Sequence, residues 1–159
     1  YLKRARAAAR AGTLGARTDV MPALEGLGRL FNRLHQGKTV AITGGANAVF
    51  RGEAQDFEEM MGNLMDNACK WASRNVDVVV DGGQGDQELV LRVSDDGSGL
   101  TEEQRVGALQ RGVRLDETTP GTGLGLSIVT ELGELHKGTL ELGDSPTGGL
   151  SVELRVPAR

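Results

Sequence analysis

The chain has 159 residues, of which 38% are hydrophobic and 25% charged, a balance that predicts one compact domain and excludes a largely disordered chain. Its formal net charge of -4 argues against holding nucleic acid by phosphate neutralisation, and no apolar run approaches the roughly 18 residues that cross a bilayer. The single cysteine, Cys69, excludes an internal disulfide and a thiolate zinc cluster, and we interpret it as a small buried apolar residue.

The first 35 residues combine a basic start with an amphipathic segment. Because the chain begins with Tyr1, we expect it to be a piece of a longer polypeptide, with residues 1–16 the end of a preceding helix and residues 17–159 the domain proper. Asp19 and Pro22 are typical of a helix start, and the apolar residues behind them recur at helical spacing. This pattern predicts a helix over residues 22–35.

The middle of the chain alternates short β-like runs with one long helix. The runs 39–43 and 48–51, joined by Gly44-Gly45-Ala46-Asn47, predict a β-hairpin. A broad apolar stripe without proline predicts a helix over residues 55–72. The β-branched runs 76–80 and 89–94, separated by the glycine-rich residues 81–86, predict a second hairpin.

The last third contains a polar stretch followed by regular elements. Residues 99–123, with a short helix near 101–109, predict a mobile surface segment, and a helix over 124–135 and strands at 139–142 and 150–156 complete the chain. Helices interleaved with antiparallel hairpins predict an α/β fold, a two-layer α/β sandwich with helices on one face of a mixed, mostly antiparallel sheet.

Three polar side chains share one stripe of the long helix. Asn63, Asn67 and Lys70 stand at i, i+4 and i+7 among apolar residues. Amide oxygens are acceptable Mg²⁺ ligands when phosphate oxygens and waters complete the octahedron, and a lysine nearby would meet phosphate charge. A solvent-facing helix edge is the alternative interpretation.

A second polar group, Asp95-Asp96-Gly97-Ser98-Gly99, directly follows a predicted strand. A carboxylate at the edge of a sheet can accept a hydrogen bond from the exocyclic amino group of adenine, and glycines let a ring approach the backbone. The same residues could form a plain turn.

A third group, residues 121–127, places glycines before a predicted helix, where unpaired backbone amides and the helix dipole favour an anion such as a triphosphate. The segment lacks the Gly-Lys-Ser/Thr of a Walker loop and the strand and acidic partner of the Rossmann fingerprint. By itself it is a weak signal.

Together, in this order, the three groups resemble the N, G1 and G2 boxes of the ATP-binding domain shared by sensor histidine kinases, gyrase and MutL. The stretch 59–71 is most similar to the N box of PhoQ-like sensor kinases, and the resemblance covers about residues 20–157. It implies a Bergerat-type fold with a mobile ATP lid, in the cytoplasmic part of a bacterial sensor anchored in the inner membrane.

The resemblance also implies roles for individual residues. Asn63 and Asn67 would hold Mg²⁺ and phosphate, Lys70 would contact phosphate, and Asp95 would bind the adenine amino group. The remaining nucleotide contacts that it implies are Trp71, Gly97, Gly99, Arg114, Gly121, Thr122, Gly123, Leu124, Gly125 and Leu126. Trp71 stands where the family usually has tyrosine or phenylalanine, and ordinary core packing is its alternative.

The lid departs from the family pattern. Arg111-Gly112-Val113-Arg114 resembles the version in PhoQ-like kinases, but Thr118 and Thr119 fill the stretch where a second basic residue is usual. Thr122 replaces a glutamine that can approach the metal. Nucleotide affinity and lid closure are therefore the properties that the resemblance specifies least.

The N box also bears on the reaction. Asn63 stands where gyrase-like relatives have a glutamate, and an amide cannot accept a proton, so we expect slow spontaneous hydrolysis. Glu59, one turn earlier, is interpreted as a surface or orienting residue. His35 and His136 both stand at predicted helix ends, outside any phosphoacceptor motif, and are interpreted as helix-terminating residues.

We therefore expect a protein-histidine kinase domain that transfers the γ-phosphoryl group of Mg-ATP to a histidine on its own, absent dimerisation domain. The alternatives are an ATP-hydrolysing clamp or chaperone-type ATPase, a degenerate nucleotide-binding regulatory module, and an anti-sigma serine kinase, which usually keeps the N-box glutamate. The expected partners are the dimerisation domain and a downstream response regulator, but no nucleic acid. We expect this fragment to be a monomer and the parent protein a homodimer.

Overall fold

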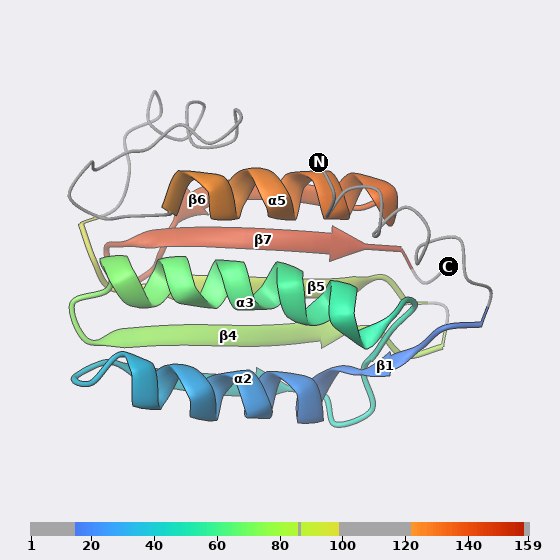
Figure 1. Cartoon of the computed structure of the whole chain (residues 1–159), viewed down its shortest axis with the longest axis horizontal. Helices are drawn as coiled ribbons and strands as arrows, with labels where there is room; N and C mark the ends of the chain where they lie inside the picture. The colour runs from blue at the N-terminus through green and yellow to red at the C-terminus, as the bar shows by residue number, and fades with distance from the viewer. Residues whose placement is uncertain (1–14, 86, 99–121, 158–159) are drawn as a thin grey trace.

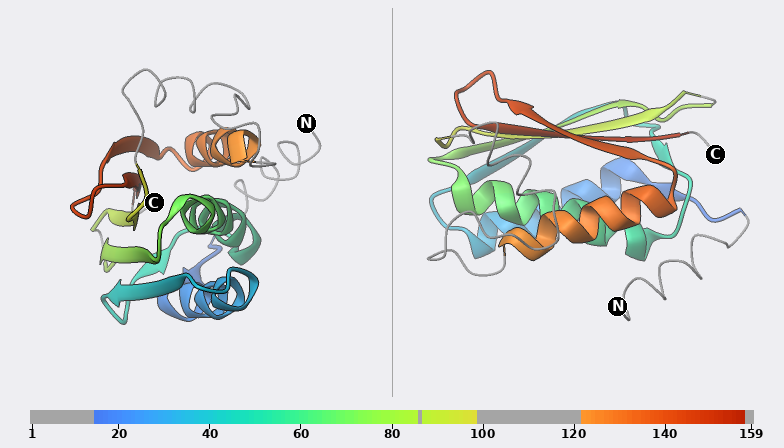
Figure 2. Two further views of the ribbon diagram at one scale, coloured as in Figure 1. Left: turned by 90° about the vertical axis from the view of Figure 1, so that its left-hand side faces the viewer. Right: turned by 90° about the horizontal axis from the view of Figure 1, so that it is seen from above.

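The fold has two layers, a sheet and a set of helices packed on one of its faces (Figures 1 and 2). The computed structural model describes residues 15–85, 87–98 and 122–157. The helices are α2 (Val20–Leu34), α3 (Ala54–Trp71) and α5 (Thr122–Leu135). The five strands of the main sheet lie in the order β2 (Thr39–Gly44), β4 (Asn75–Gly82), β5 (Leu89–Asp95), β7 (Leu150–Val156) and β6 (Thr139–Asp144).

Among the strands that the structure describes in this sheet, only the β2–β4 pair is parallel, and the pairs β4–β5, β5–β7 and β6–β7 are antiparallel. The predicted two-layer sandwich with a mixed, mostly antiparallel sheet is therefore confirmed. Within the described residues, no helix combines the length and the apolar character needed to cross a membrane.

The predicted hairpin of residues 39–43 and 48–51 is wrong. β2 pairs in parallel with β4, whereas β3 (Val49–Phe50) pairs with β1 (Thr18–Asp19) in a separate small sheet. The glycine at position 44 is required for a reason other than a hairpin turn. Gly44 has φ 149°, and a Cβ there would lie 2.6 Å from the carbonyl oxygen of Val80. The glycine thus permits close approach between β2 and β4 and does not form a two-strand turn.

The predicted hairpin of β4 and β5 is confirmed, with Val78 opposite Val93 in the register. Its loop uses glycine for backbone geometry, because Gly82, Gly83 and Gly85 have φ values of 67°, 74° and 60°. A Cβ at Gly82 would also clash with the carbonyl oxygen of Glu88.

The core lies between the helices and the sheet. Alternate β4 residues Val76, Val78 and Val80 point into it and are at most 4% exposed, as expected for a strand with one covered face. The central helix α3 contributes a set of fully buried side chains, Phe57, Met60, Met61, Leu64, Met65 and Cys69. Burial raises the pKa of the Cys69 thiol to about 11, so this residue is the inert small apolar residue that we expected.

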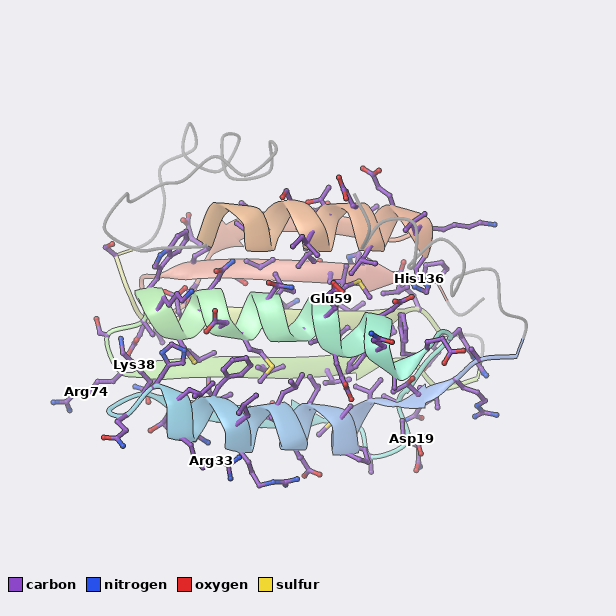
Figure 3. The ribbon with its side chains drawn as sticks, viewed as in Figure 1. Asp19, Arg33, Lys38, Glu59, Arg74 and His136 are labelled. Atoms are coloured by element: carbon purple, nitrogen blue, oxygen red, sulfur yellow. The ribbon has the colours of Figure 1, made fainter. Side chains whose placement is uncertain are left out.

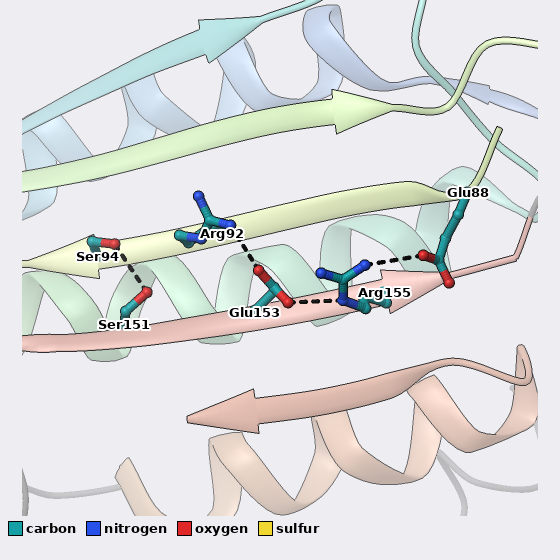
Figure 4. A network of polar contacts seen from close by, with 6 residues as sticks. All are labelled: Glu88, Arg92, Ser94, Ser151, Glu153 and Arg155. Carbon is teal, nitrogen blue, oxygen red and sulfur yellow. Dashed lines mark hydrogen bonds and ion pairs between the residues drawn. The ribbon is translucent and has the colours of Figure 1, made fainter. Parts of the chain in front are cut away.

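The outer face of the sheet carries a network of charged and polar side chains on and beside β5 and β7 (Figure 4). Glu153 on β7 accepts hydrogen bonds of 2.8 Å from both Arg92 and Arg155, and Arg155 also pairs with Glu88 at 3.1 Å. The hydrogen bonds from the two arginines hold the pKa of Glu153 below its usual value. Such cross-strand pairs suit a solvated face, in keeping with the described helices, which lie on the other face of the sheet.

Candidate functional site

The candidate site lies where three elements meet at one end of the sheet: the last two turns of α3, the start of α5 and the end of β5 (Figure 1). A small cavity of about 10 Å³ opens between them. Its lining combines residues from all three predicted boxes with apolar residues of the sheet and helices, namely Leu64, Asn67, Ala68, Trp71, Val93, Asp95, Leu126, Leu150 and Val152. The fold thus brings together segments that are about 60 residues apart in the sequence.

Asp95 is the buried carboxylate of this cavity. The residue is 3% exposed, and its Oδ1 atom accepts hydrogen bonds from the backbone N–H groups of Gly97 at 2.8 Å and Leu150 at 3.3 Å. Burial raises the pKa of the carboxyl above its usual value, and the two N–H donors partly oppose that rise. Because both bonds reach the same oxygen, they fix the orientation of the carboxylate and leave Oδ2 as a second acceptor.

Two glycines allow the backbone to close around Asp95. A Cβ at Gly97 would clash with the carbonyl oxygen of Trp71, and a Cβ at Gly149 would clash with the Asp95 side chain. Gly97 was predicted as a site residue on the grounds of ligand approach, and the structure shows that it is needed for the packing of one chain segment on another. Gly149 was missed, although it belongs to a glycine cluster visible in the sequence.

Asp96, the neighbour of Asp95, joins two loops of the site. Its Oδ1 atom accepts hydrogen bonds from three successive backbone N–H groups, of Ser73 at 2.8 Å, Arg74 at 2.9 Å and Asn75 at 3.0 Å. These donors, with Arg74 the strongest, lower the pKa of the Asp96 carboxyl. Asp96 therefore joins the loop between α3 and β4 to the turn after β5. The sequence did not predict this role, because the partners of Asp96 are 21 to 23 residues away.

The polar stripe of α3 divides into a buried and a half-buried part. Asn67 is 7% exposed and lines the cavity, so a solvent-facing helix edge is wrong for this residue. Asn63 is half-buried, and its Nδ2 atom donates a hydrogen bond of 2.6 Å to the backbone carbonyl of Glu59. Trp71, the last residue of the helix, both lines the cavity and packs against the core.

Lys70 forms an ion pair of 3.0 Å with Asp66, one turn earlier on the same helix. This partner was not anticipated, although the i, i+4 spacing of an aspartate and a lysine is a signal that the sequence offers.

The G2 box forms the start of α5. The helix begins at Thr122, so Thr122, Gly123, Leu124 and Gly125 form its first turn, two residues ahead of the predicted start, and Leu126 is 2% exposed in the cavity wall. The first N–H groups of a helix have no intrahelical acceptor, so they can receive an anion. Gly99, Arg114 and Gly121 lie outside the described residues, as do the predicted lid and the helix over 101–109.

The two histidines end helices, as predicted, and each also binds an aspartate of α3. The backbone N–H of His35 donates to a carbonyl of the preceding turn at 2.9 Å, and that of His136 does so at 3.2 Å. The ring nitrogen Nε2 of His35 lies 2.9 Å from Oδ1 of Asp66, and that of His136 lies 3.2 Å from Oδ2 of Asp56. These pairs join α2 and α5 to the central helix and were missed, because each links distant parts of the sequence.

The candidate metal ligands are amides. In the part of the chain that the structure describes, no group of three or more His, Cys, Asp or Glu side chains is arranged to hold a metal ion. Amide oxygens can bind a cation when oxygens of a bound ligand and of water complete its coordination shell.

Comparison with known proteins places these features in a family. Residues 52–159 match the family described as histidine kinase-, DNA gyrase B-, and HSP90-like ATPase. Among curated relatives, the sensor protein kinase CarS of Pseudomonas aeruginosa is 48% identical over 105 residues, which are 66% of this chain and 23% of the relative. The sensor protein PhoQ of Escherichia coli K12 is 36% identical over 153 residues, 94% of this chain and 31% of the relative. The chain thus spans less than a third of the length of these relatives.

Solved structures show the same fold. The ATP binding domain of PrrB from Mycobacterium tuberculosis has a TM-score of 0.74 at 23% identity, covering 91% of this chain and 97% of that one. Full-length ShkA in complex with AMPPNP has a TM-score of 0.77 at 23% identity, covering 98% of this chain and 34% of that one. At these identities the likeness concerns the fold, whereas the family match covers more than half of the chain. The chain therefore belongs to the histidine kinase-, DNA gyrase B- and HSP90-like ATPase family.

Proposed function

We propose that this chain is the ATP-binding catalytic domain of a sensor histidine kinase, which transfers the γ-phosphoryl group of Mg-ATP to a histidine on a dimerisation domain. The observation that carries the proposal is the buried, backbone-anchored carboxylate of Asp95 in an otherwise mostly apolar cavity, next to the N-terminus of α5. The curated relatives that match this chain are named sensor kinases and sensor proteins, which supports the same activity.

The cavity has the chemistry to bind adenine. Adenine is a flat ring whose exocyclic amino group donates hydrogen bonds, and Asp95 presents a carboxylate of fixed orientation to receive one. The walls made by Leu64, Val93 and Leu126 would contact the faces of the ring. Since the cavity has a volume of only about 10 Å³, we expect nucleotide binding to widen it.

The phosphates would lie between the start of α5 and the polar stripe of α3. The N–H groups of the first turn of α5 and the helix dipole favour negative charge, and Lys70 adds a positive charge from α3. Asn63 donates to the helix backbone through Nδ2, so its amide oxygen is the end that a cation would meet. We propose that Asn63 and Asn67 hold Mg²⁺, whose chemical contribution is to neutralise charge on the phosphates.

Two features favour phosphoryl transfer over hydrolysis. The position of Asn63 offers an amide and not a carboxylate, so it cannot take a proton from an attacking water. Neither histidine of this chain is placed to receive the phosphoryl group, because the side chains of His35 and His136 are 20% and 5% exposed and both bind aspartates. The acceptor histidine therefore belongs to a domain outside this chain.

We extend the proposal to the whole protein. We propose that the nucleotide is also contacted by Gly97, Gly99, Arg114, Gly121 and the first residues of α5. The parent protein would be a homodimeric bacterial sensor anchored in the inner membrane, with this domain in the cytoplasm and a response regulator as the downstream acceptor. The names of the curated relatives support the sensor role, and this fragment alone is expected to be monomeric.

A transfer experiment tests the proposal. The chain is incubated with Mg-ATP labelled at the γ-phosphate, with and without a purified dimerisation domain from the PhoQ relative. We expect label on that domain's histidine and little phosphate release without it, and Asp95→Asn serves as the control with weakened ATP binding. Steady phosphate release without acceptor would instead indicate a clamp-type ATPase, and binding of ATP with neither outcome would indicate a regulatory module. Absence of ATP binding would refute the proposal.

A further inference from the structure

Asp66 holds two partners from different helices with its two carboxylate oxygens. Oδ1 lies 2.9 Å from Nε2 of His35, which follows α2, and Oδ2 lies 3.0 Å from Nζ of Lys70, one turn further along α3. All three side chains are partly exposed, by 20% for His35, 27% for Lys70 and 34% for Asp66. The carboxylate therefore bridges a ring fixed at a helix end and a flexible ammonium.

The bridge lies inside the stripe that the proposed function assigns to phosphate and Mg²⁺. Asp66 follows Asn63 by three positions and precedes Lys70 by four, so these three side chains share one face of the helix. A negative charge this close to a bound triphosphate is unfavourable unless a cation compensates it. In the nucleotide-free domain that cation is Lys70, which the proposed function also assigns to phosphate.

A second histidine–aspartate pair provides a natural comparison. His136 and Asp56 lie at the other end of α3, with side chains 5% and 0% exposed, and the His136 ring packs 4.9 Å from the ring of Phe50. Figure 3 shows His136 at the end of the molecule opposite to Lys38, which follows His35 by three residues. The second pair is thus remote from the cavity and enclosed in the core.

We propose that Asp66 is the counter-ion that Lys70 exchanges for nucleotide phosphate, and that His35 holds the same carboxylate in place during the exchange. The inference rests on the proposed function, since it assumes that a triphosphate binds beside α3. A partly exposed ion pair is weak, so a phosphate group with more negative charge can replace Asp66 as the partner of the lysine. Asp66 then competes with the nucleotide for Lys70, and its hydrogen bond to His35 changes when the lysine leaves.

The ring nitrogens of the two histidines report the exchange directly. The chain has only two histidines, so a nitrogen NMR spectrum of the imidazoles contains two sets of signals, and the variant His136→Gln assigns them. We expect the non-hydrolysable analogue AMPPNP with Mg²⁺ to shift the His35 signals and to leave those of His136 in place. Adenosine, which has no phosphate, should move neither set. Because Trp71 is the only tryptophan and lines the cavity, its fluorescence shows that each ligand is bound.

Binding constants give a second, independent readout. Removal of the competing charge in Asp66→Asn should tighten AMPPNP binding by about two- to fivefold, the range expected for a partly exposed ion pair. Asp66→Glu should bind AMPPNP like the wild type, and adenosine affinity should not change. Asp77→Asn, which removes an exposed carboxylate on the outer face of β4, is the matched charge control.

The outcomes separate this inference from the proposed function. If AMPPNP binds but the His35 signals stay in place, or if Asp66→Asn binds it equally or more weakly, the exchange is wrong and the ATP-binding function stands. An effect of the same size in Asp77→Asn would also overturn the exchange, because it would reflect net charge alone. If no adenine nucleotide produces a saturable signal from Trp71 or in calorimetry, the proposed function fails, and the exchange fails with it.

Discussion

Replacing Asp95 by asparagine should weaken ATP binding while leaving the fold of this domain intact. Asparagine keeps an oxygen that can accept the N–H groups of Gly97 and Leu150, so the anchoring hydrogen bonds at 2.8 and 3.3 Å can persist. The charge is lost, and with it a hydrogen bond from the adenine amino group to an ionised acceptor, worth about 1.5–3 kcal/mol. That range corresponds to roughly a 10- to 150-fold weaker Kd for ATP.

The pH dependence of stability gives the same variant a second signature. Burial raises the pKa of Asp95 from its ordinary value of 3.8, so the folded state binds this proton more tightly than the unfolded state does. The ionised carboxylate therefore destabilises the fold above the raised pKa, and the penalty disappears as pH falls through it. Asp95→Asn should consequently be at least as stable as the wild type at neutral pH, whereas its advantage should shrink in acid.

The assay is calorimetric titration with ATP and with GTP, together with thermal unfolding of both proteins. Guanine presents a carbonyl oxygen where adenine has its amino group, so the carboxylate should repel it. We expect the wild type to prefer ATP and Asp95→Asn to lose that preference while its melting temperature does not fall. An unchanged ATP affinity, or an unchanged ratio of ATP to GTP affinity, would refute the adenine assignment.

Three further predictions concern the structure around the site. Gly97→Ala should destabilise the fold by about 1–3 kcal/mol, because its Cβ would clash with the Trp71 carbonyl; thermal unfolding measures this, and wild-type stability would contradict the packing. Asp96→Ala should lower the melting temperature at neutral pH, because three N–H groups lose their acceptor. Folding lowers the pKa of Asp96 from 3.8, so the stabilisation by its carboxylate is present above pH 3.8 and is lost as pH falls through the lowered pKa. The difference in stability between Asp96→Ala and the wild type should therefore shrink in acid. A difference that stays constant with pH would argue against an ionised Asp96 as the acceptor of these N–H groups. Cys69, with a pKa of about 11 and no exposure, should resist alkylation at pH 8 until the protein unfolds, and rapid modification of the native protein would contradict its burial.

The long elements were predictable because their signals are local. α3 was expected over 55–72 and lies at Ala54–Trp71, and the β4–β5 hairpin carries its β-branched strands and glycine loop in one continuous stretch. The pairing of β3 was not predictable in the same way. Its two residues pair with β1, about 30 positions earlier, because Phe50 is fully buried beside Phe57 with ring centroids 5.3 Å apart. Tertiary packing decided that pairing, and a local turn signal could not show it.

In the candidate site, too, the local motifs were predictable and the long-range contacts were not. The motifs around Asn67, Asp95 and Leu126 were visible as separate short patterns, and the fold brings all three to one cavity. The contacts that orient them were missed, because Asp96 reaches back to the end of α3 and His35 reaches forward to Asp66. Such partners are chosen by the packing of helices on the sheet, and nothing in their local sequence distinguishes them from ordinary surface residues.

Isothermal titration of Mg-ATP into the purified chain distinguishes a kinase domain from a hydrolase, because one trace reports both binding and turnover. We expect saturable heat with one site per chain and no continuing heat after saturation, because the phosphoryl group is transferred only to an acceptor on another domain. Sustained heat after each injection would show hydrolysis and contradict the kinase assignment. The absence of any binding heat, with Trp71 fluorescence also unchanged, would contradict the nucleotide site itself.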